Sequence, residues 1–451
     1  MNRSYEKSLR ILLISIGLLL LCAAFYQVWV QCYNPYLHMP FFRRGNYMLT
    51  IMYGAVLLLC VLSLKGHTLG EARLTEVIAA QCISVLMTAV IVYFPMSLLQ
   101  YELLEFRPLL LLVPGQWLLV AAWNLLANRI YFKLVPPLRM LLVCDSHSRG
   151  GREIAKKLNG IPEKYDICGQ IGTEDGEDAV RERLRDYDAA LLLVKDEEQK
   201  RRLVQMCFHQ NIQLFLAPTL TDVIVNRAKV THSVDTPLLR STAHHLTLEG
   251  RAVKRGMDLL GAAAGLVITS PLLLLAALAI KAGDGGPVFF RQERLTRDGK
   301  VFRIYKFRSM VTDAEREGQR LAAENDRRVT GVGRILRKTR IDELPQLFNV
   351  LRGDMSLVGP RPECPAIAAE YEKTLPEFSC RLKMKAGITG YAQIYGNYTT
   401  SPADKLLMDI MYIERSNALL DINLLLLTLR TLLMTDKTRG LPVNRREGDE
   451  L

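Results

Sequence analysis

The sequence is most informative between Gly331 and Glu363, where it reads GVGRILRKTRIDELPQLFNVLRGDMSLVGPRPE. Asp342 and Glu343 are adjacent carboxylates, and a run of cations comes directly before them: Arg334, Arg337, Lys338 and Arg340. Nearby positive charge stabilises the ionised form of an acid. We therefore expect both acids to be anions at neutral pH. Cations beside ionised carboxylates also suit a phosphate-bearing substrate with Mg²⁺, which proteins hold through one or two carboxylates and the phosphate oxygens of the substrate.

An arginine between two prolines follows in the same stretch. Pro360 and Pro362 have fixed φ angles, so Arg361 is presented from a stiff backbone, which suits bidentate recognition of a phosphate. Before it, Gly353 and Asp354 predict a tight turn. An isolated Asp-Glu pair would carry little weight, because most such pairs lie on solvated helix faces. The dense combination of acids, cations, glycines and prolines is what predicts a site.

Four segments, in this order along the chain, resemble the bacterial sugar transferase family, the polyprenyl-phosphate glycosyl-1-phosphate transferases, also called monotopic phosphoglycosyl transferases. The segments are KRGMDLLGAAAGLVITSP, PVFFRQERLTRDGKVFRIYKFRSM, the pair DELPQL and GDMSLVGPRP, and KAGITGYAQIYG. The resemblance extends from about Arg251 to the end of the chain. One departure is Ala386, where the family usually has proline.

The resemblance implies an activity. Members of the family transfer a sugar 1-phosphate from a UDP-sugar to a polyprenyl phosphate, which is undecaprenyl phosphate in bacteria, and release UMP. By motif position, Asp342 matches the nucleophile that carries a covalent phosphosugar, and Glu343 matches a Mg²⁺ ligand. Arg337 matches a phosphate-binding arginine. Arg361, between its two prolines, matches the residue that binds the uridine nucleotide.

Such a reaction would initiate surface polysaccharide or glycoconjugate assembly, for example of an exopolysaccharide, a capsule or an O-antigen. The sugar stays open, with galactose, glucose and N-acetylated sugars as candidates. Two other functions also stay open: a membrane-bound glycosyltransferase that releases UDP, and a non-catalytic membrane receptor or scaffold. The many-helix phosphoglycosyl transferases, which run the same reaction, would need more membrane spans than we find here.

Composition indicates a membrane part joined to a charged part, because 49% of the 451 residues are hydrophobic while 23% are charged. A net charge of +12 fits either nucleic acid or an anionic bilayer surface. The long apolar runs favour the bilayer, so we expect membrane lipid and no nucleic acid as a partner. The nine cysteines form no CxxC pair and the seven histidines no ligand set, which predicts reduced thiols and no zinc site.

The first 135 residues hold four apolar segments, each long enough to cross a bilayer: Leu9 to Val30, Tyr47 to Leu64, Val77 to Leu99, and Leu109 to Ala127. Cations lie before the first, between the second and third, and after the fourth. The positive-inside rule therefore places both ends of this bundle in the cytoplasm. The sequence predicts a four-helix anchor over residues 1–135, in which a dimer interface is a further option.

Residues 136–235 alternate short apolar runs with charged helical stretches, which predicts a small Rossmann-like α/β domain with a parallel sheet. The turn after its first strand reads CDSHSRGG and lacks the GxGxxG that a dinucleotide site would need. We therefore expect a structural or regulatory module, with another small ligand as the alternative. Residues 236–250, which include His244 and His245, are predicted to be a linker.

The run from Gly256 to Ile280 is long enough to span a membrane, but two features favour a helix that enters and returns. Ser270 and Pro271 lie at its middle, where proline removes a backbone donor and predicts a sharp bend. Cations flank both ends, which places both on the cytoplasmic face. The resemblance implies the same re-entrant helix, broken at Ser270 and Pro271. It also matches Lys254 and Arg255 to the basic start, at headgroup depth, where they would attract a lipid phosphate.

The catalytic part, residues 251–451, is predicted to be mainly helical and to rest on the inner membrane with its site on the cytoplasmic face. Aromatic residues are expected to dip into the interface: Phe289, Phe290, Phe302 and Phe307. Residues 308–320 and SPADKLLMDIMYIERS are expected to be helical, and ALLDINLLLLTLRTLLM is expected to form an interfacial amphipathic helix. Gly387 and Gly390 would allow a close backbone approach, to the substrate or within an ordinary turn.

Overall fold

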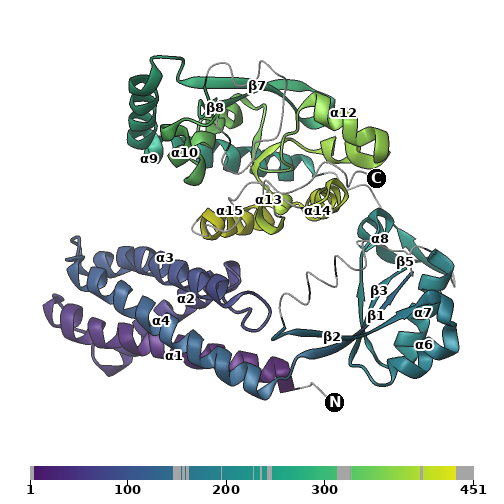
Figure 1. The fold of residues 1–451 in the computed structure, drawn as a ribbon. Helices are drawn as coiled ribbons and strands as arrows, with labels where there is room; N and C mark the ends of the chain where they lie inside the picture. The colour runs from purple at the N-terminus through teal and green to yellow at the C-terminus, as the bar shows by residue number, and fades with distance from the viewer. Residues whose placement is uncertain are drawn as a thin grey trace. The chain divides into compact units, whose positions relative to one another are not determined.

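The computed structural model describes residues 5–145, 154, 158, 162–194, 196–226, 228–233, 236–240, 246–311, 326, 328–396 and 400–432, and the statements below concern these. Three predictions therefore fall wholly or partly outside it: most of the turn after the first strand, the two histidines at 244 and 245, and residues 312–320 of the helix predicted over 308–320. Residues 308–311 of that helix are described and are not helical, since Met310 instead forms an antiparallel bridge with Val329. The chain forms two compact units, Met1–Pro218 and Thr219–Leu451. Figure 1 gives the order of the elements.

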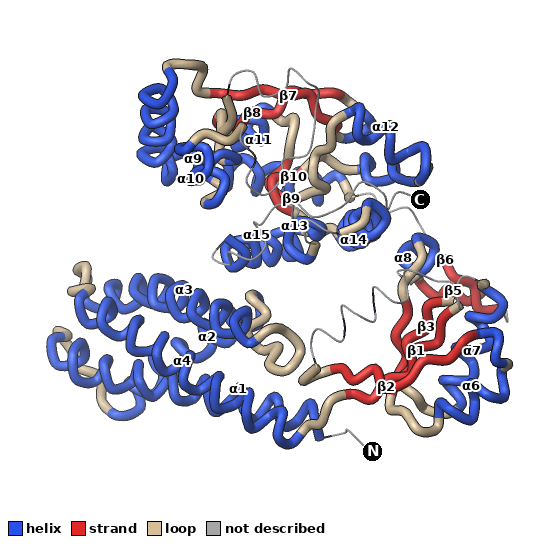
Figure 2. The backbone as a smooth tube through the Cα atoms, viewed as in Figure 1, coloured by secondary structure: helices blue, strands red, loops and turns tan. Residues whose placement is uncertain are grey.

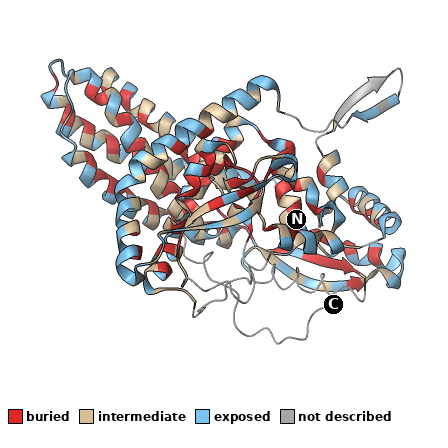
Figure 3. Cartoon of the chain, turned by 90° about the horizontal axis from the view of Figure 1, so that it is seen from above, coloured by how far each residue is buried: buried red, intermediate tan, exposed pale blue. Residues whose placement is uncertain are grey.

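The first unit begins with four long helices: α1 (Tyr5–Val28), α2 (Arg43–Ser63), α3 (Leu74–Gln100) and α4 (Arg107–Leu134). A π-helical turn (Trp29–Tyr33) and a 3₁₀ turn (Asn34–Tyr36) extend α1. Each helix packs against two of the others, α1 and α3 both lying between α2 and α4. Buried residues line their inner faces (Figure 3). All four, together with α9 described below, are long and apolar enough to cross a membrane, which agrees with the predicted segments.

Polar side chains inside this bundle are neutral and join helices to one another. Gln116 of α4 accepts a hydrogen bond from Tyr53 of α2 at 3.0 Å and donates one to the Leu21 carbonyl of α1 at 2.9 Å. Asn124 donates to Gln81 at 2.8 Å. A buried polar group is expensive in hydrocarbon unless it is hydrogen-bonded, so these pairs fix which helix faces meet.

The predicted parallel sheet is present (Figure 2). Its strands are β1 (Leu138–Cys144), β2 (Tyr165–Gly172), β3 (Ala189–Leu193) and β4 (Gln213–Leu216), in the order β2-β1-β3-β4 with every neighbour parallel. The 3₁₀ turn Thr173–Asp175 follows β2, and α6 (Glu177–Leu184) and α7 (Glu197–His209) are the helices. Leu141 and Val143 pack toward α6 and α7, whereas Met140 and Leu142 pack on the opposite face. Burial on both faces explains why β1 is apolar apart from Arg139.

The second unit starts earlier than the predicted linker. Helix α8 (Leu220–Val225) packs Val223 into the same core as Ala262 and Leu406. The hairpin of β5 (Lys229–Ser233) and β6 (Thr236–Arg240) follows. Residues 219–240 thus hold regular structure where the sequence predicted the end of the α/β domain and part of a linker.

Helix α9 (Leu248–Asp284) contains Pro271 but is one continuous helix, so the predicted break does not divide it into two. Pro271 cannot donate to the Val267 carbonyl four residues earlier. The hydroxyl of Ser270 donates to that carbonyl instead, at 2.8 Å. The Ser-Pro pair therefore leaves this carbonyl satisfied. The dip into a bilayer and the return stay a prediction.

The remaining elements surround one core. They are the antiparallel hairpin of β7 (Phe289–Leu295) and β8 (Val301–Phe307), joined by the 3₁₀ turn Arg297–Gly299, then α10 (Gly331–Lys338), the 3₁₀ turn Ile341–Glu343, α11 (Gln346–Arg352), β9 (Ser356–Val358), α12 (Pro365–Thr374), the 3₁₀ segment Pro376–Lys383, β10 (Gly387–Thr389), α13 (Tyr391–Tyr395), α14 (Pro402–Arg415) and α15 (Ala418–Leu432). Strands β9 and β10 pair in parallel. The core joins both to α9, α14 and α15.

The predicted aromatic platform is wrong for two of its four members. Phe302 and Phe307 are 8% and 2% exposed and belong to two separate buried clusters, whereas Phe289 is 46% exposed and stacks on Phe307 at 5.5 Å. The strands of the hairpin present alternate residues to opposite faces, which interleaved aromatics and cations in sequence do not reveal. Helix α15 does have an exposed apolar stripe, Leu419, Ile422 and Leu429, as expected of an interfacial helix.

Candidate active site

The two predicted acids lie in a 3₁₀ turn between α10 and α11. Thr339 ends α10, and Arg340 then takes a positive φ of 59°, which reverses the chain into the turn Ile341–Glu343. Pro345 follows as the residue before α11, a position where its missing donor does no harm. Side chains of consecutive residues in a 3₁₀ turn point about 120° apart. Asp342 and Glu343 therefore face different surroundings, as their two expected roles require.

Glu343 is surrounded by cations from three separate segments. Its carboxylate lies 3.2 Å from Nη2 of Arg361, 3.4 Å from Nζ of Lys306 and 3.7 Å from Nη1 of Arg340. Burial alone would raise the pKa of this carboxyl, but the cations outweigh burial and hold the pKa well below its ordinary value. The prediction that Glu343 is ionised is confirmed.

Asp342 has the opposite shift. Burial, and then the negative charge of Glu343, raise its pKa to about 6, although Lys306, Arg337 and Arg340 partly offset them. The pKa is raised because the side chain is only 9% exposed and shares its site with a second anion, but it stays below 7, which agrees with the expectation that Asp342 is an anion at neutral pH. Most Asp342 side chains are still ionised at pH 7. No other described residue gives Asp342 a hydrogen bond or ion pair, so its oxygens are available to a substrate.

Lys306 is the site residue that sequence reasoning did not single out. It lies on β8, and Asn349 of α11 fixes that strand by accepting from the Tyr305 N–H at 2.9 Å and donating to the Arg303 carbonyl at 2.8 Å. This double contact brings Lys306 to Glu343, 37 residues away in sequence. The sequence signal for Lys306 was a lysine between two aromatic residues, in YKF. This pattern by itself is typical of any strand at the edge of a sheet.

Arg337 and Arg361 approach the acids from two directions. Arg337 stands in the last turn of α10 and lowers the pKa of Asp342 without a direct contact to it. Arg361 follows β9 and reaches Glu343 with a side chain that is still 43% exposed, so it can also contact a ligand. The predicted turn at Gly353 is present, with φ at +99°.

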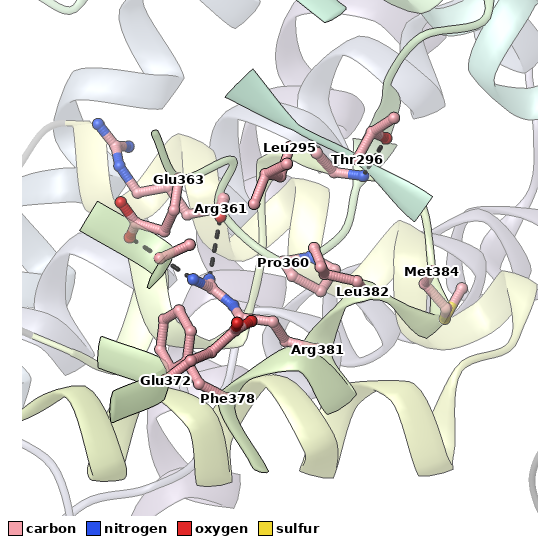
Figure 4. Close-up of a pocket in the computed structure, with 12 residues that line it drawn as sticks. Leu295, Thr296, Pro360, Arg361, Glu363, Glu372, Phe378, Arg381, Leu382 and Met384 are labelled. Carbon is pink, nitrogen blue, oxygen red and sulfur yellow. Dashed lines mark hydrogen bonds and ion pairs between the residues drawn. The ribbon is translucent and has the colours of Figure 1, made fainter. Parts of the chain in front are cut away.

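The loop that carries Arg361 packs tightly on β10. A Cβ at Gly387 would lie 2.0 Å from the Gly359 nitrogen, and one at Gly390 would lie 2.2 Å from the Gly359 carbonyl oxygen. The two glycines therefore allow the close approach of this loop, not of a substrate. A cavity of about 10 Å³ behind the loop is lined by Pro360, Arg361, Phe378 and Arg381 among others (Figure 4). It has room for about one water molecule and none for a nucleotide base.

Lys254 and Arg255, predicted to face lipid headgroups, both bind protein groups. Lys254 pairs with Asp421 at 2.6 Å. Arg255 donates to the carbonyls of Val350 and Leu351, at 2.7 and 2.9 Å, and so caps the end of α11. Ser270 and Pro271 lie in the middle of α9, far along the chain from the two acids.

A divalent cation would have two carboxylates at this site. No group of three His, Cys, Asp or Glu side chains in the described residues could hold a metal, so a cation here would rely on phosphate oxygens for its other ligands. Glu343 fits this use because it is ionised. The three cations around Glu343 would repel a metal ion that bound alone. The metal would therefore bind together with an anion, such as a diphosphate.

Comparison with known proteins identifies the family of this chain. Residues 249–435 match the family model for bacterial sugar transferases. Over 256 residues the chain is 36% identical to the UDP-N-acetylgalactosamine-undecaprenyl-phosphate N-acetylgalactosaminephosphotransferase of Aeromonas hydrophila, which covers 55% of this chain and 59% of that protein. It is 44% identical over 188 residues to the UDP-glucose:undecaprenyl-phosphate glucose-1-phosphate transferase of Caulobacter vibrioides, covering 41% of this chain and 70% of that protein.

A third relative is covered almost completely. The exopolysaccharide production protein PSS of Rhizobium leguminosarum is 39% identical over 199 residues, which is 42% of this chain and 96% of that protein. The chain spans only 59% of the Aeromonas protein. The match to the family model lies in the second unit, which contains the two acids and the Arg361 loop. The chain therefore belongs to the bacterial sugar transferase family.

Proposed function

We propose that this protein transfers a sugar 1-phosphate from a UDP-sugar to undecaprenyl phosphate, or another polyprenyl phosphate, and releases UMP. Three named relatives support the substrate classes, because two are undecaprenyl-phosphate sugar-phosphate transferases and the third takes part in exopolysaccharide production. Within the structure, one observation carries the proposal: Asp342 is a buried carboxylate to which no other described residue gives a hydrogen bond or ion pair, and the carboxylate beside it lies close to three cations. The transfer would initiate assembly of a surface polysaccharide or glycoconjugate.

In this proposal Asp342 is the nucleophile. Its carboxylate oxygen attacks the phosphorus that bears the sugar, the bond from that phosphorus to the bridging oxygen breaks, and the electron pair leaves with UMP. An acyl phosphate carrying the sugar remains on Asp342. An oxygen of the polyprenyl phosphate then attacks the same phosphorus and displaces the carboxylate. Unpaired oxygens at Asp342 fit this role, because a nucleophile with fixed hydrogen-bond partners would have to lose them first.

The cations would neutralise charge as two phosphate reactants approach each other. Lys306, Arg340 and Arg361 meet at Glu343, and Arg337 stands near Asp342. Positive groups fixed in a low-dielectric site stabilise developing negative charge more than they would in water. Glu343 would hold Mg²⁺ together with the diphosphate oxygens, and the ion would supply further charge neutralisation there.

Contacts of α9 support a location at one membrane face. Near its start Lys254 pairs with Asp421, and near its end Ile280 packs against Phe307 and Leu336. Both halves thus contact the same charged unit, while Val267 and Ile268 between them are 74% and 77% exposed. A helix that crossed a bilayer would separate its two ends by the membrane. We therefore place α9 as a re-entrant element, with the site at the cytoplasmic face of the inner membrane.

Incubation with the donor alone tests the proposal. Wild-type protein should release UMP and gain the mass of a sugar phosphate, and Asp342→Asn should do neither, which corresponds to a loss of activity beyond about a thousandfold. The matched control is Asp404→Asn, which makes the same chemical change at an exposed residue in the first turn of α14 and should label normally. UDP release without a protein adduct would instead identify a glycosyltransferase. A panel of UDP-sugars in the same assay would identify the sugar.

A further inference from the structure

Buried cations hold both ends of the short loop that carries Arg361. The Val358 carbonyl accepts hydrogen bonds from Nζ of Lys254 and from the hydroxyl of Tyr412, each at 3.0 Å. The Arg361 carbonyl accepts one from Nη2 of Arg381 at 2.9 Å, and Figure 4 shows this guanidinium between Arg361 and Glu363. Between these two carbonyls a backbone N–H binds the loop, since Gly387 donates to the Pro360 carbonyl at 2.9 Å.

Each cation is fixed by a buried carboxylate in turn. Lys254 lies 2.6 Å from Asp421, and Arg381 lies 2.6 Å from Asp409. The two acids are 3% and 1% exposed. Removing such charges from water is unfavourable, and a well-packed apolar pair of similar volume is often as stable or more so. Stability is therefore a weak reason for two such pairs. The feature they share is a donor placed on a carbonyl of this one loop.

Neither pair touches Asp342 or Glu343. Between the two clamped carbonyls, the side chain of Arg361 extends to Glu343 at 3.2 Å. We propose that the Lys254–Asp421 and Arg381–Asp409 pairs are positioning pairs, which fix the backbone on either side of Pro360 and so direct Arg361 toward Glu343 and the diphosphate of the nucleotide. This inference rests on the proposed function, in which Arg361 binds the nucleotide.

The inference gives Lys254 a role other than the predicted one. A lysine ammonium has three N–H donors. The partners of Lys254 are also three: Asp421, the Val358 carbonyl and, at 3.3 Å, the hydroxyl of Tyr412. Its side chain is only 12% exposed. No donor is left for a lipid phosphate, so Lys254 acts on the nucleotide loop through the backbone.

The test removes each pair without leaving a lone buried charge. We would prepare Arg381→Met with Asp409→Leu, and Lys254→Met with Asp421→Leu, in the full chain in nanodiscs. UDP affinity is measured by calorimetry, and kcat and KM are measured for both substrates. We expect UDP affinity to fall and the KM for the UDP-sugar to rise about 10- to 100-fold, as for a contact displaced by about 1 Å. The KM for the polyprenyl phosphate should stay within twofold.

Three further variants separate positioning from general damage. In an Arg361→Ala background, both pair replacements should lower UDP affinity no further, because they act through Arg361. Ile410→Ala, at a buried neighbour of Asp409 on the same helix that carries no charge and makes no hydrogen bond to the loop carbonyls, should leave UDP affinity unchanged. Arg381→Lys, which keeps the charge, should recover part of the affinity that the apolar pair loses.

Three results would overturn the inference. Wild-type UDP affinity in both pair replacements would show that the clamps are unnecessary. An equal loss of affinity with and without Arg361 would show that they act on the fold as a whole. Unchanged UDP affinity in Arg361→Ala alone would overturn the nucleotide role of Arg361 and, with it, this inference, whereas the first two results leave the proposed function intact.

Discussion

The four-helix bundle and the catalytic unit differ in the kind of polar side chain that each of them buries. In the described bundle the buried polar side chains are all neutral, and pairs such as Tyr53 with Gln116 join one helix to the next. In the catalytic unit the buried polar groups include whole ion pairs, and Asp342 is buried without a partner. Hydrogen-bonded neutral groups determine how helices pack. Buried ionisable side chains with shifted pKa values are more typical of catalytic sites.

Helix α9 shows why composition alone does not separate the two regions. It meets the same criteria of length and hydropathy as the four bundle helices, and like α3 and α4 it contains a proline. What differs is that its ends bind a charged fold.

The largest contrast concerns membrane topology. Gly256→Cys and Gly283→Cys place thiols near the two ends of α9, where a Cβ meets no other atom within 4 Å. A membrane-impermeant reagent should label both from the side that labels native Cys168, and not from the side that labels native Cys32, at the far end of the first helix; both native thiols are exposed. If the two introduced cysteines report opposite faces, α9 is a fifth span and the contrast fails.

Removing one charge from the catalytic unit should affect rate more than stability. Glu343→Gln is expected to lower turnover about a hundredfold and to weaken its dependence on Mg²⁺, because one charge-stabilising contact is lost. Glu370→Gln, on the exposed side of α12, is the matched control and should behave as wild type. Steady-state rates across a Mg²⁺ series measure both effects. Wild-type Mg²⁺ dependence in Glu343→Gln would exclude the metal role.

The pH dependence should follow Asp342. Its raised pKa of about 6 means that the nucleophilic form is lost as pH falls, so the rate of labelling from donor alone should drop about tenfold per unit below pH 6. Glu343 raises that pKa, so in Glu343→Gln the acid limb should move to lower pH. Labelling between pH 4.5 and 8 measures both. A limb near pH 4 in the wild type would contradict the burial of Asp342.

The smallest effect is expected in the bundle, and it should appear in stability and not in rate. Gln116→Leu leaves Tyr53 without its partner and should lower stability by about 1 kcal/mol with turnover unchanged. Adding Tyr53→Phe should recover most of the loss, since no polar group is then unpaired. Thermal unfolding in detergent and steady-state turnover are the measurements. A tenfold loss of turnover at unchanged stability would show that the bundle acts on catalysis.

Sequence reasoning located the acids, the Arg361 loop and the parallel sheet, because each depends on residues close together in the chain. It did not reveal that the pKa of Asp342 is raised, since the cations are visible as neighbours in sequence whereas burial arises from the packing of distant segments. Lys306 was missed for the same reason: Asn349 brings it to Glu343 across 37 residues. Lys254 was assigned to lipid because its partner Asp421 lies 167 residues away.

The hydrogen bond from the Ser270 hydroxyl to the Val267 carbonyl has a consequence for α9 within lipid. In hydrocarbon no water can bind a carbonyl oxygen that a proline has deprived of its hydrogen. The hydroxyl of Ser270, one residue before Pro271, supplies the missing hydrogen bond. The helix is therefore less stiff at the proline but exposes no unbonded carbonyl oxygen to the acyl chains. Such a helix can bend inside the membrane without exposing an unbonded polar group to the hydrocarbon.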